Sequence, residues 1–205
     1  MANTWTELFK ELDHNELREK IKVAFRPMWE LNDPAHREEH FRAVEVAGNL
    51  INEKLDLKQD PLLIMYMAWF HDLFSWDRET HHIHSNLWFL NTQHELIKSL
   101  DSAQRRLVAG ACFEHRASWN GKHSTVFSEM MASADRGVPG DVNAMLKRAI
   151  DYRLHRGFTE EEALKGATEH LKEKFGTGGY AHYPDIYLRA FGDELKKQQE
   201  EIDAL

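Results

Sequence analysis

One segment of this chain is apolar on every side and ends in a charged pair. Residues 61–70 read PLLIMYMAWF, and His71 and Asp72 follow directly. A helix that is apolar all round belongs in a protein core, where an ionised aspartate costs several kcal/mol unless a positive group pairs with it. A neutral imidazole beside a carboxylate is also a good ligand pair for a divalent metal. The doublet therefore predicts either an ion pair with a distant partner or half of a metal site.

The rest of the chain predicts an all-α fold. Apolar residues recur at helical spacing, and the alternation of β-branched residues that is typical of strands is almost absent. Asp-Pro pairs at 33–34 and 60–61 indicate helix starts, and Thr4 and Thr159 begin capping-box patterns. The helices that we expect cover residues 14–31 with a kink or break at Pro27, 33–51, 61 through the doublet, 80–100, 102–117, 124–135, 141–155, 159–175 and 184–203.

Length and composition indicate one globular domain. The chain has 205 residues, of which 42% are hydrophobic and 29% are charged, as is ordinary for a globular protein with a full core. It contains no repeat and no low-complexity linker. We therefore expect a single helical domain over residues 1–205, in which the helices of about 141–205 form a C-terminal extension.

Charge and cysteine content narrow the class of protein. The net charge of −8 argues against a surface that binds polynucleotides, but it allows a small phosphorylated ligand held by local cations. No apolar run approaches the roughly 20 residues that span a bilayer, and the N-terminus lacks a signal-peptide pattern, so no membrane partner is expected. Cys112 is the single cysteine, which fits a reducing cytoplasm. We expect a cytoplasmic protein, and the sequence leaves a homo-oligomer open.

Histidines and acidic residues form a recurring pattern along the expected helices. His36 and His40 are four residues apart on one expected helix and would share a face. The His71-Asp72 doublet follows, and Asp135 ends a later expected helix. An imidazole, an adjacent imidazole and carboxylate, and a distant carboxylate make a mixed nitrogen and oxygen ligand set. Such a set suits Mn²⁺, Fe²⁺, Co²⁺, Ni²⁺ or Zn²⁺.

This order of motifs resembles the HD-domain superfamily of metal-dependent phosphohydrolases. Residues 40–47 (HFRAVEVA) are similar to the first motif of that family, residues 68–72 (AWFHD) to its second and residues 133–135 (SAD) to its last. The resemblance spans about residues 33–140 and implies an HD-type helical bundle with its core in that range. It further implies that one metal ion is held by His40, His71, Asp72 and Asp135.

Two branches of the superfamily are similar to parts of this chain. The H-x-x-x-H spacing resembles the cyclic-nucleotide phosphodiesterases, which implies His36 as the general acid and, with it, Asp72 at the catalytic metal. Small HD proteins of this length carry an Asn-Glu pair after the doublet, whereas residues 81–86 here read HHIHSN. The chain lacks the Glu-Asp pair of (p)ppGpp hydrolases and the Gly-Tyr-Pro signature of the cyclic-di-GMP branch, which disfavours both activities.

The residues around these motifs predict hydrolysis of a phosphate by water that a metal activates. We expect His115 and His82 to contact phosphate or to bind a second metal, and Asp77 to orient the water or a ligand histidine. Cations would neutralise the phosphate oxygens. The candidates for this role are Arg37, Arg116, Lys122, His123 and Arg136.

We therefore expect a phosphohydrolase that uses one or two divalent ions, drawn from Mn, Co, Ni, Fe, Zn and Mg. A nucleotide or deoxynucleotide is the expected substrate, and cleavage of a monoester, an anhydride or a diester stays open. The altered Asn-Glu stretch keeps an alternative, a non-catalytic regulatory protein that binds a metal or nucleotide. A di-iron HD oxygenase is a third hypothesis, for which His82 and His115 would supply the extra ligands.

Overall fold

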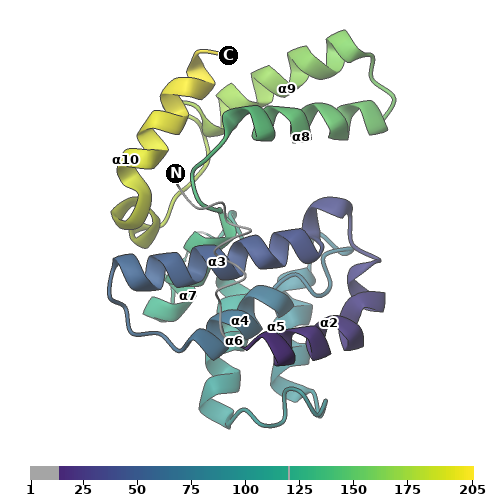
Figure 1. The fold of residues 1–205 in the computed structure, drawn as a ribbon, viewed down its shortest axis with the longest axis vertical. Coiled ribbons are helices and arrows are strands. Elements are labelled where there is room, and N and C mark those ends of the chain that lie inside the picture. Colours follow the sequence, from purple (N-terminus) through teal and green to yellow (C-terminus); the bar gives the residue numbers. More distant parts are fainter. Residues whose placement is uncertain (1–13, 120) are drawn as a thin grey trace. The chain divides into compact units, whose positions relative to one another are not determined.

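The computed structural model describes residues 14–119 and 121–205 (Figure 1). Every regular element in these ranges is a helix, so the prediction of an all-α protein is confirmed. The described residues form two compact units. One unit comprises residues 14–137 and 184–190, and the other comprises residues 138–183 and 191–205. The capping box expected at Thr4 lies outside the described residues.

The first unit is built around the apolar helix α4 (Pro61–Phe70). All residues of α4 from Leu63 to Phe70 are buried, and the helix packs against α3, α6 and α7. The Asp60 side chain accepts a hydrogen bond from the Leu62 N–H and so caps α4, as the sequence predicts. The other helices of this unit are α2 (Asn15–Trp29), η1 (Pro34–His36), α3 (Glu38–Lys54), α5 (His81–Asn91), α6 (Ser102–Glu114) and α7 (Val126–Asp135).

The helix expected from residue 33 onward is interrupted, so the prediction that His36 and His40 share a helix is wrong. His36 ends the short 3₁₀ helix η1, and Arg37 has an extended backbone (φ −118°, ψ −164°) before α3 begins. The side-chain amide of Asn32 donates to the His36 carbonyl at 2.9 Å. That carbonyl is therefore engaged by a side chain instead of by the backbone N–H four residues later, as a continuous helix would require.

Two further helices are shorter than expected. The helix predicted for 80–100 ends at Asn91, because Thr92 is extended (ψ 139°) and its carbonyl accepts from Arg105 Nη1 at 2.7 Å. The helix predicted to reach about residue 117 ends at Glu114. There the Arg136 guanidinium donates a hydrogen bond to the His115 carbonyl at 2.8 Å. In both places a side chain from another segment donates a hydrogen bond to a carbonyl. In a longer helix that carbonyl would instead accept from a backbone N–H.

A buried ion pair connects α2, α3 and α4 in this unit. Arg18 on α2 donates through Nε and Nη2 to both oxygens of Glu45 on α3, at 2.9 and 2.5 Å. Trp69 Nε1 on α4 donates to the same carboxylate at 2.7 Å. Both charged residues are 2% exposed. The pair is therefore fully desolvated, and its hydrogen bonds offset the cost of burial.

The second unit contains the helical hairpin of α8 (Val142–His155) and α9 (Glu160–Phe175), which lie side by side in Figure 1. The capping box predicted at Thr159 is present, with Glu162 as its partner. Helix α10 (Asp185–Asp203) is interrupted at Phe191 (φ −136°), so its later part belongs to this unit. The buried side chains of Val142, Leu171 and Ile202 form the core of the unit.

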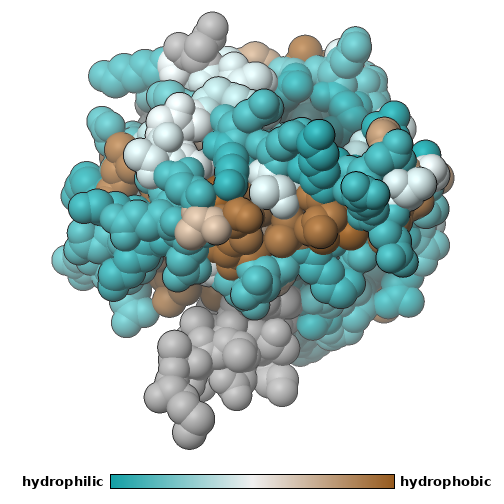
Figure 2. Space-filling view, turned by 90° about the horizontal axis from the view of Figure 1, so that it is seen from above, coloured by the Kyte–Doolittle hydropathy of each residue, from teal (hydrophilic) through white to brown (hydrophobic). Residues whose placement is uncertain are grey.

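The surface shown in Figure 2 is mostly hydrophilic, with apolar side chains confined largely to one narrow band. This pattern agrees with the charged composition of the chain. Among the described residues, no helix combines the length and the apolar character needed to cross a bilayer.

Candidate metal centre

The His71-Asp72 doublet lies where α4 ends, and both side chains are buried. The backbone N–H of His71 still donates to the Met67 carbonyl at 2.9 Å, so the doublet continues the last turn of α4. The Asn32 amide donates to the Asp72 carbonyl at 3.0 Å and holds the backbone where the helix ends. The two polar side chains are thus fixed at the edge of the apolar core.

The first cluster of the centre consists of the doublet with His40 from α3 and Asp135 from the end of α7. His40 Nε2 lies 3.1 Å from His71 Nε2 and 3.2 Å from Asp135 Oδ1. Asp72 Oδ2 lies 3.6 Å from His40 Nε2 and 3.5 Å from His71 Nε2. The structure therefore brings together the four side chains that the family resemblance assigns to one metal ion.

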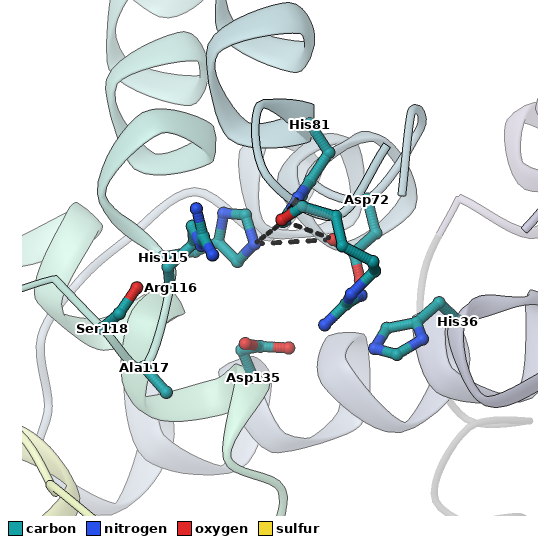
Figure 3. A pocket seen from close by; sticks show the side chains of 9 residues that line it. His36, Asp72, His81, His115, Arg116, Ala117, Ser118 and Asp135 are labelled. Atoms are coloured by element: carbon teal, nitrogen blue, oxygen red, sulfur yellow. Dashed lines mark hydrogen bonds and ion pairs between the residues drawn. The ribbon is translucent and has the colours of Figure 1, made fainter. Parts of the chain in front are cut away.

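The second cluster lies on the other side of the same carboxylate. Asp72 Oδ1 is 3.2 Å from Nε2 of His81, the first residue of α5, and 3.5 Å from Nε2 of His115, which follows α6. The two imidazole nitrogens are 3.3 Å apart. Figure 3 shows these three side chains converging. Asp72 thus faces one histidine pair with each of its oxygens.

His81 was missed by the sequence analysis, which chose the neighbouring His82 instead. The ring of His82 packs against Phe113, with centroids 5.5 Å apart, and its Nδ1 lies 3.4 Å from Arg116 Nη1. Successive residues on a helix point about 100° apart, so only one of the two histidines can face Asp72. The packing of α5 against α6 selects His81.

Asp77 shapes the turn before α5 and does not belong to either cluster. Its carboxylate accepts from the Thr80 hydroxyl at 2.5 Å and from the Glu79 backbone N–H at 3.3 Å. Its Oδ2 lies 3.9 Å from His84 Nε2 at the surface. Among the described residues, Asp77 makes no direct contact with a histidine of either cluster, so no contact supports its predicted role in orienting a water or a ligand histidine.

Three of the histidines direct Nε2 toward the carboxylates. Their Nδ1 contacts the carbonyl of the residue three positions earlier, so Nδ1 carries a proton and Nε2 is the atom left to bind a cation. Imidazole nitrogens this close to one another and to carboxylates form a donor set that a cation can use once Nε2 is unprotonated. The contacts are His71 to Ala68 at 2.9 Å, His81 to Arg78 at 3.2 Å and His115 to Cys112 at 2.7 Å.

A buried oxygen supports the same conclusion. Asp72 Oδ1 has no hydrogen-bond partner in the described part of the chain, although it is shielded from solvent. A buried acceptor without a partner is costly. A cation between this oxygen and the histidines of the second cluster would satisfy it.

The two clusters differ in how they shift the pKa of their histidines. Burial alone would lower the pKa of His71, but the carboxylates of Asp72 and Asp135 outweigh burial and raise it to about 9. The pKa of His81 is instead lowered to about 4, first by burial and then by the charge of His115. Burial would raise the pKa of both carboxyl groups, but the nearby histidines hold them well below the usual value. The first cluster thus keeps two carboxylates that attract positive charge at neutral pH.

A cavity of about 260 Å³ opens beside the centre (Figure 3). His36 lies in its wall, as Figure 3 shows, and its Nδ1 contacts Asp33 Oδ2 at 2.7 Å. The His36 ring remains 5.6 Å from that of His40 although the two residues lie on different helices. Mainly because of burial, the pKa of His36 lies below its usual value. The described lining consists of His36, Asp72, Arg78, His81, His115, Arg116, Ala117, Ser118 and Asp135.

Of the five cations predicted to bind phosphate, the structure places one, Arg116, in the cavity wall. Arg37 donates instead to the carbonyls of Asn32 and Glu30, at 2.9 and 3.1 Å, near the end of α2. Arg136 donates to the His115 carbonyl at 2.8 Å. These guanidinium groups donate to carbonyls that lack a helical partner where helices end, an alternative role for an arginine beside a site residue.

The remaining two cations lie in the loop that precedes α7, outside the lining of the cavity. They are Lys122, which is exposed, and His123, which is half-buried. Arg78 was not predicted, yet it lines the cavity from the turn between the doublet and α5. Arg78 belongs to no recognisable sequence motif, so its position in the cavity wall follows only from the path of the turn.

Comparison with protein-family models, with curated proteins and with solved structures found no match. The interpretation of the site therefore depends on its own geometry. That geometry is a buried group of histidine and aspartate side chains, within a helical fold, that could hold a metal ion.

Proposed function

We propose that this protein is a divalent-metal-dependent phosphohydrolase with an HD-type helical bundle, acting on a small phosphorylated molecule. The observation that carries the proposal is the position of Asp72. One of its oxygens faces His40 and His71, and the other faces His81 and His115. A carboxylate placed in this way could contribute one oxygen to each of two metal positions, an arrangement that would suit a two-metal hydrolytic site.

The first cluster would hold one cation and the second cluster would hold another, with Asp72 shared between them. Imidazole and carboxylate donors without sulfur suit Mn²⁺, Fe²⁺, Co²⁺, Ni²⁺ or Zn²⁺. When bound, such ions supply hydroxide at neutral pH and stabilise negative charge on phosphoryl oxygens. The order of the ligands along the chain, and their meeting in one place, also support the resemblance to the HD superfamily.

The residues of the cavity wall would supply the proton and the positive charge that hydrolysis needs. His36 contacts Asp33 through Nδ1, so its Nε2 is the atom that would hold and donate a proton to the leaving oxygen. The Asp33 carboxylate fixes the orientation of the ring. Arg78 and Arg116 would balance the charge of the phosphoryl group.

Hydrolysis can be tested with purified protein loaded in turn with Mn²⁺, Co²⁺, Ni²⁺ or Zn²⁺ and a panel of phosphomonoesters, nucleotides and phosphodiesters. We expect phosphate or nucleoside release from the wild type and none from the His71→Ala/Asp72→Ala double variant. The exposed His155 on α8 provides a matched control, since His155→Ala should retain full activity. Saturable ligand binding without turnover in any metal would overturn the proposal and indicate a regulatory protein.

A di-iron oxygenase is the second candidate, and the second cluster is the observation that favours it. His81 and His115 give the second position nitrogen ligands of its own, which suit iron as well as zinc or manganese. Elemental analysis that finds two irons per chain, together with O₂ consumption on adding substrate, would favour this activity over hydrolysis.

A further inference from the structure

The cavity beside the metal centre is lined by polar and charged side chains. Apart from the side chains of the two clusters, its described lining is His36, Arg78, Arg116, Ala117 and Ser118. No Phe, Tyr or Trp, and no aliphatic side chain larger than alanine, is among these described residues. Binding of a nucleobase normally uses an apolar or aromatic surface on which the base stacks. The described lining offers no such surface.

The volume of the cavity leads to the same conclusion. It measures about 260 Å³, whereas pockets for drug-sized ligands, the size class of a nucleotide, measure about 300–1,000 Å³. A phosphate group next to the clusters, together with a small organic part, would fit in this space. The ribose and base of a nucleotide would then extend beyond the described lining.

The two arginines retain donors that an anion can use. In the described part of the chain, the Arg78 guanidinium makes no hydrogen bond or ion pair. Arg116 is held through Nη1, which donates to the Glu79 carbonyl at 2.9 Å and lies 3.4 Å from His82 Nδ1, whereas Nε and Nη2 make no such bond among the described residues. The planar fork of a guanidinium that is held in place with free N–H groups can donate two parallel hydrogen bonds to a pair of phosphate oxygens.

Arg78 lies near two histidines of the cavity wall. Burial is the main reason why the pKa values of His36 and His81 are lowered, and the positive charge of Arg78 lowers both further. His36 comes from η1 and His81 from α5. Arg78 lines the same cavity as His36 and His81, where its guanidinium can contact an anion bound beside the clusters.

We propose, on the basis of the phosphohydrolase function above, that Arg78 and Arg116 together bind the phosphate of the substrate and that the substrate is a compact phosphate ester without a nucleobase. The arginines act as phosphate-binding residues because they recognise the anionic group that all such esters share. The organic part of the substrate contributes little to affinity. This proposal replaces the nucleotide that the sequence analysis expects.

Calorimetric titration of the Mn²⁺-loaded protein tests the proposal without turnover. Methylphosphonate and adenosine 5′-methylenephosphonate have C–P bonds that resist hydrolysis, and the second compound adds a nucleoside to the first. We expect their dissociation constants to agree within about threefold, as follows when the nucleoside makes no favourable contact. If the adenosine compound binds more than about tenfold tighter, a nucleobase is recognised and the proposal is wrong.

Arginine variants complete the test. Arg78→Ala and Arg116→Ala should each weaken methylphosphonate binding about tenfold or more, with the manganese content of the wild type. Arg106→Ala, at an exposed position on α6 outside the lining, should leave binding unchanged. If either alanine variant loses metal, Arg78→Gln or Arg116→Gln replaces it. Unchanged binding in metal-loaded variants would overturn the proposal. Because no step depends on catalysis, failure of the hydrolase assay would not be confused with failure of this one.

Discussion

Raising the pH should tighten metal binding at the first cluster, because a proton occupies His71 when no cation is bound. Burial would lower the pKa of His71, but the carboxylates of Asp72 and Asp135 raise it from 6.5 to about 9. A raised pKa means that the imidazole is protonated at neutral pH. Its Nε2 must lose this proton before it can bind a metal, so protons compete with the cation at every pH below about 9.

The size of this competition follows from the pKa. At pH 7 the gap of two units weakens the apparent affinity about 100-fold, or about 2.7 kcal/mol, relative to high pH. His71 is fully buried, so solvent does not screen this effect as it would at an exposed site. With a pKa of about 9, the apparent dissociation constant should fall about eightfold between pH 7.5 and 8.5, and should level off above about pH 9.

Calorimetric titration with Mn²⁺ in two buffers of different ionisation enthalpy measures the protons released. At pH 7.5 we expect about one proton for the cation bound at the first cluster. His155→Ala, which removes an exposed histidine, should release the same number. A dissociation constant that is flat between pH 7.5 and 8.5, with no proton released, would show that His71 is already neutral without metal and would refute the reasoning.

Three other changes test separate parts of the structure. Glu45→Gln removes the buried carboxylate to which Arg18 donates through both Nε and Nη2, so urea unfolding should show a loss of about 3–5 kcal/mol; a loss under 1 kcal/mol would contradict this. His81→Ala should reduce the metal content from two ions to one per chain, whereas Asp72→Asn should impair both sites; equal metal content by elemental analysis would contradict this. Gly48→Ala would place a Cβ 2.9 Å from a side-chain carbon of Ile64, and the crowding should cost about 1–3 kcal/mol in the same unfolding assay.

Local sequence signals predicted the parts of the fold that local physics determines. The uniform apolarity of residues 61–70 indicated a buried helix, and all residues from 63 to 70 are buried. Asp60 and Thr159 cap helices as their patterns predict, because a capping side chain bonds to a backbone only two or three residues away. The His71-Asp72 doublet could likewise be placed at the end of a core helix.

Features that depend on distant contacts could not be predicted in this way. The break before α3 requires the Asn32 amide at the His36 carbonyl, and nothing in the local spacing indicates it. The choice of His81 over His82 depends on where α5 begins and which face meets α6. Arg18 resembles an ordinary surface charge in the sequence, and its burial follows only from its pairing across two helices.

The different pKa shifts of His71 and His81 have a common explanation in the number of carboxylates near each histidine. His71 Nε2 lies 3.5 Å from oxygens of both Asp72 and Asp135, so a positive charge there is stabilised twice. His81 Nε2 lies 3.2 Å from one carboxylate, that of Asp72, and 3.3 Å from the imidazole of His115. A proton on His81 is therefore stabilised by fewer negative charges and is repelled by positive charge on His115. The same difference applies to a cation. The first cluster can attract a metal by its own charge, whereas the second depends on the carboxylate that it shares, and Asp72 is therefore the residue through which the two halves of the centre are coupled.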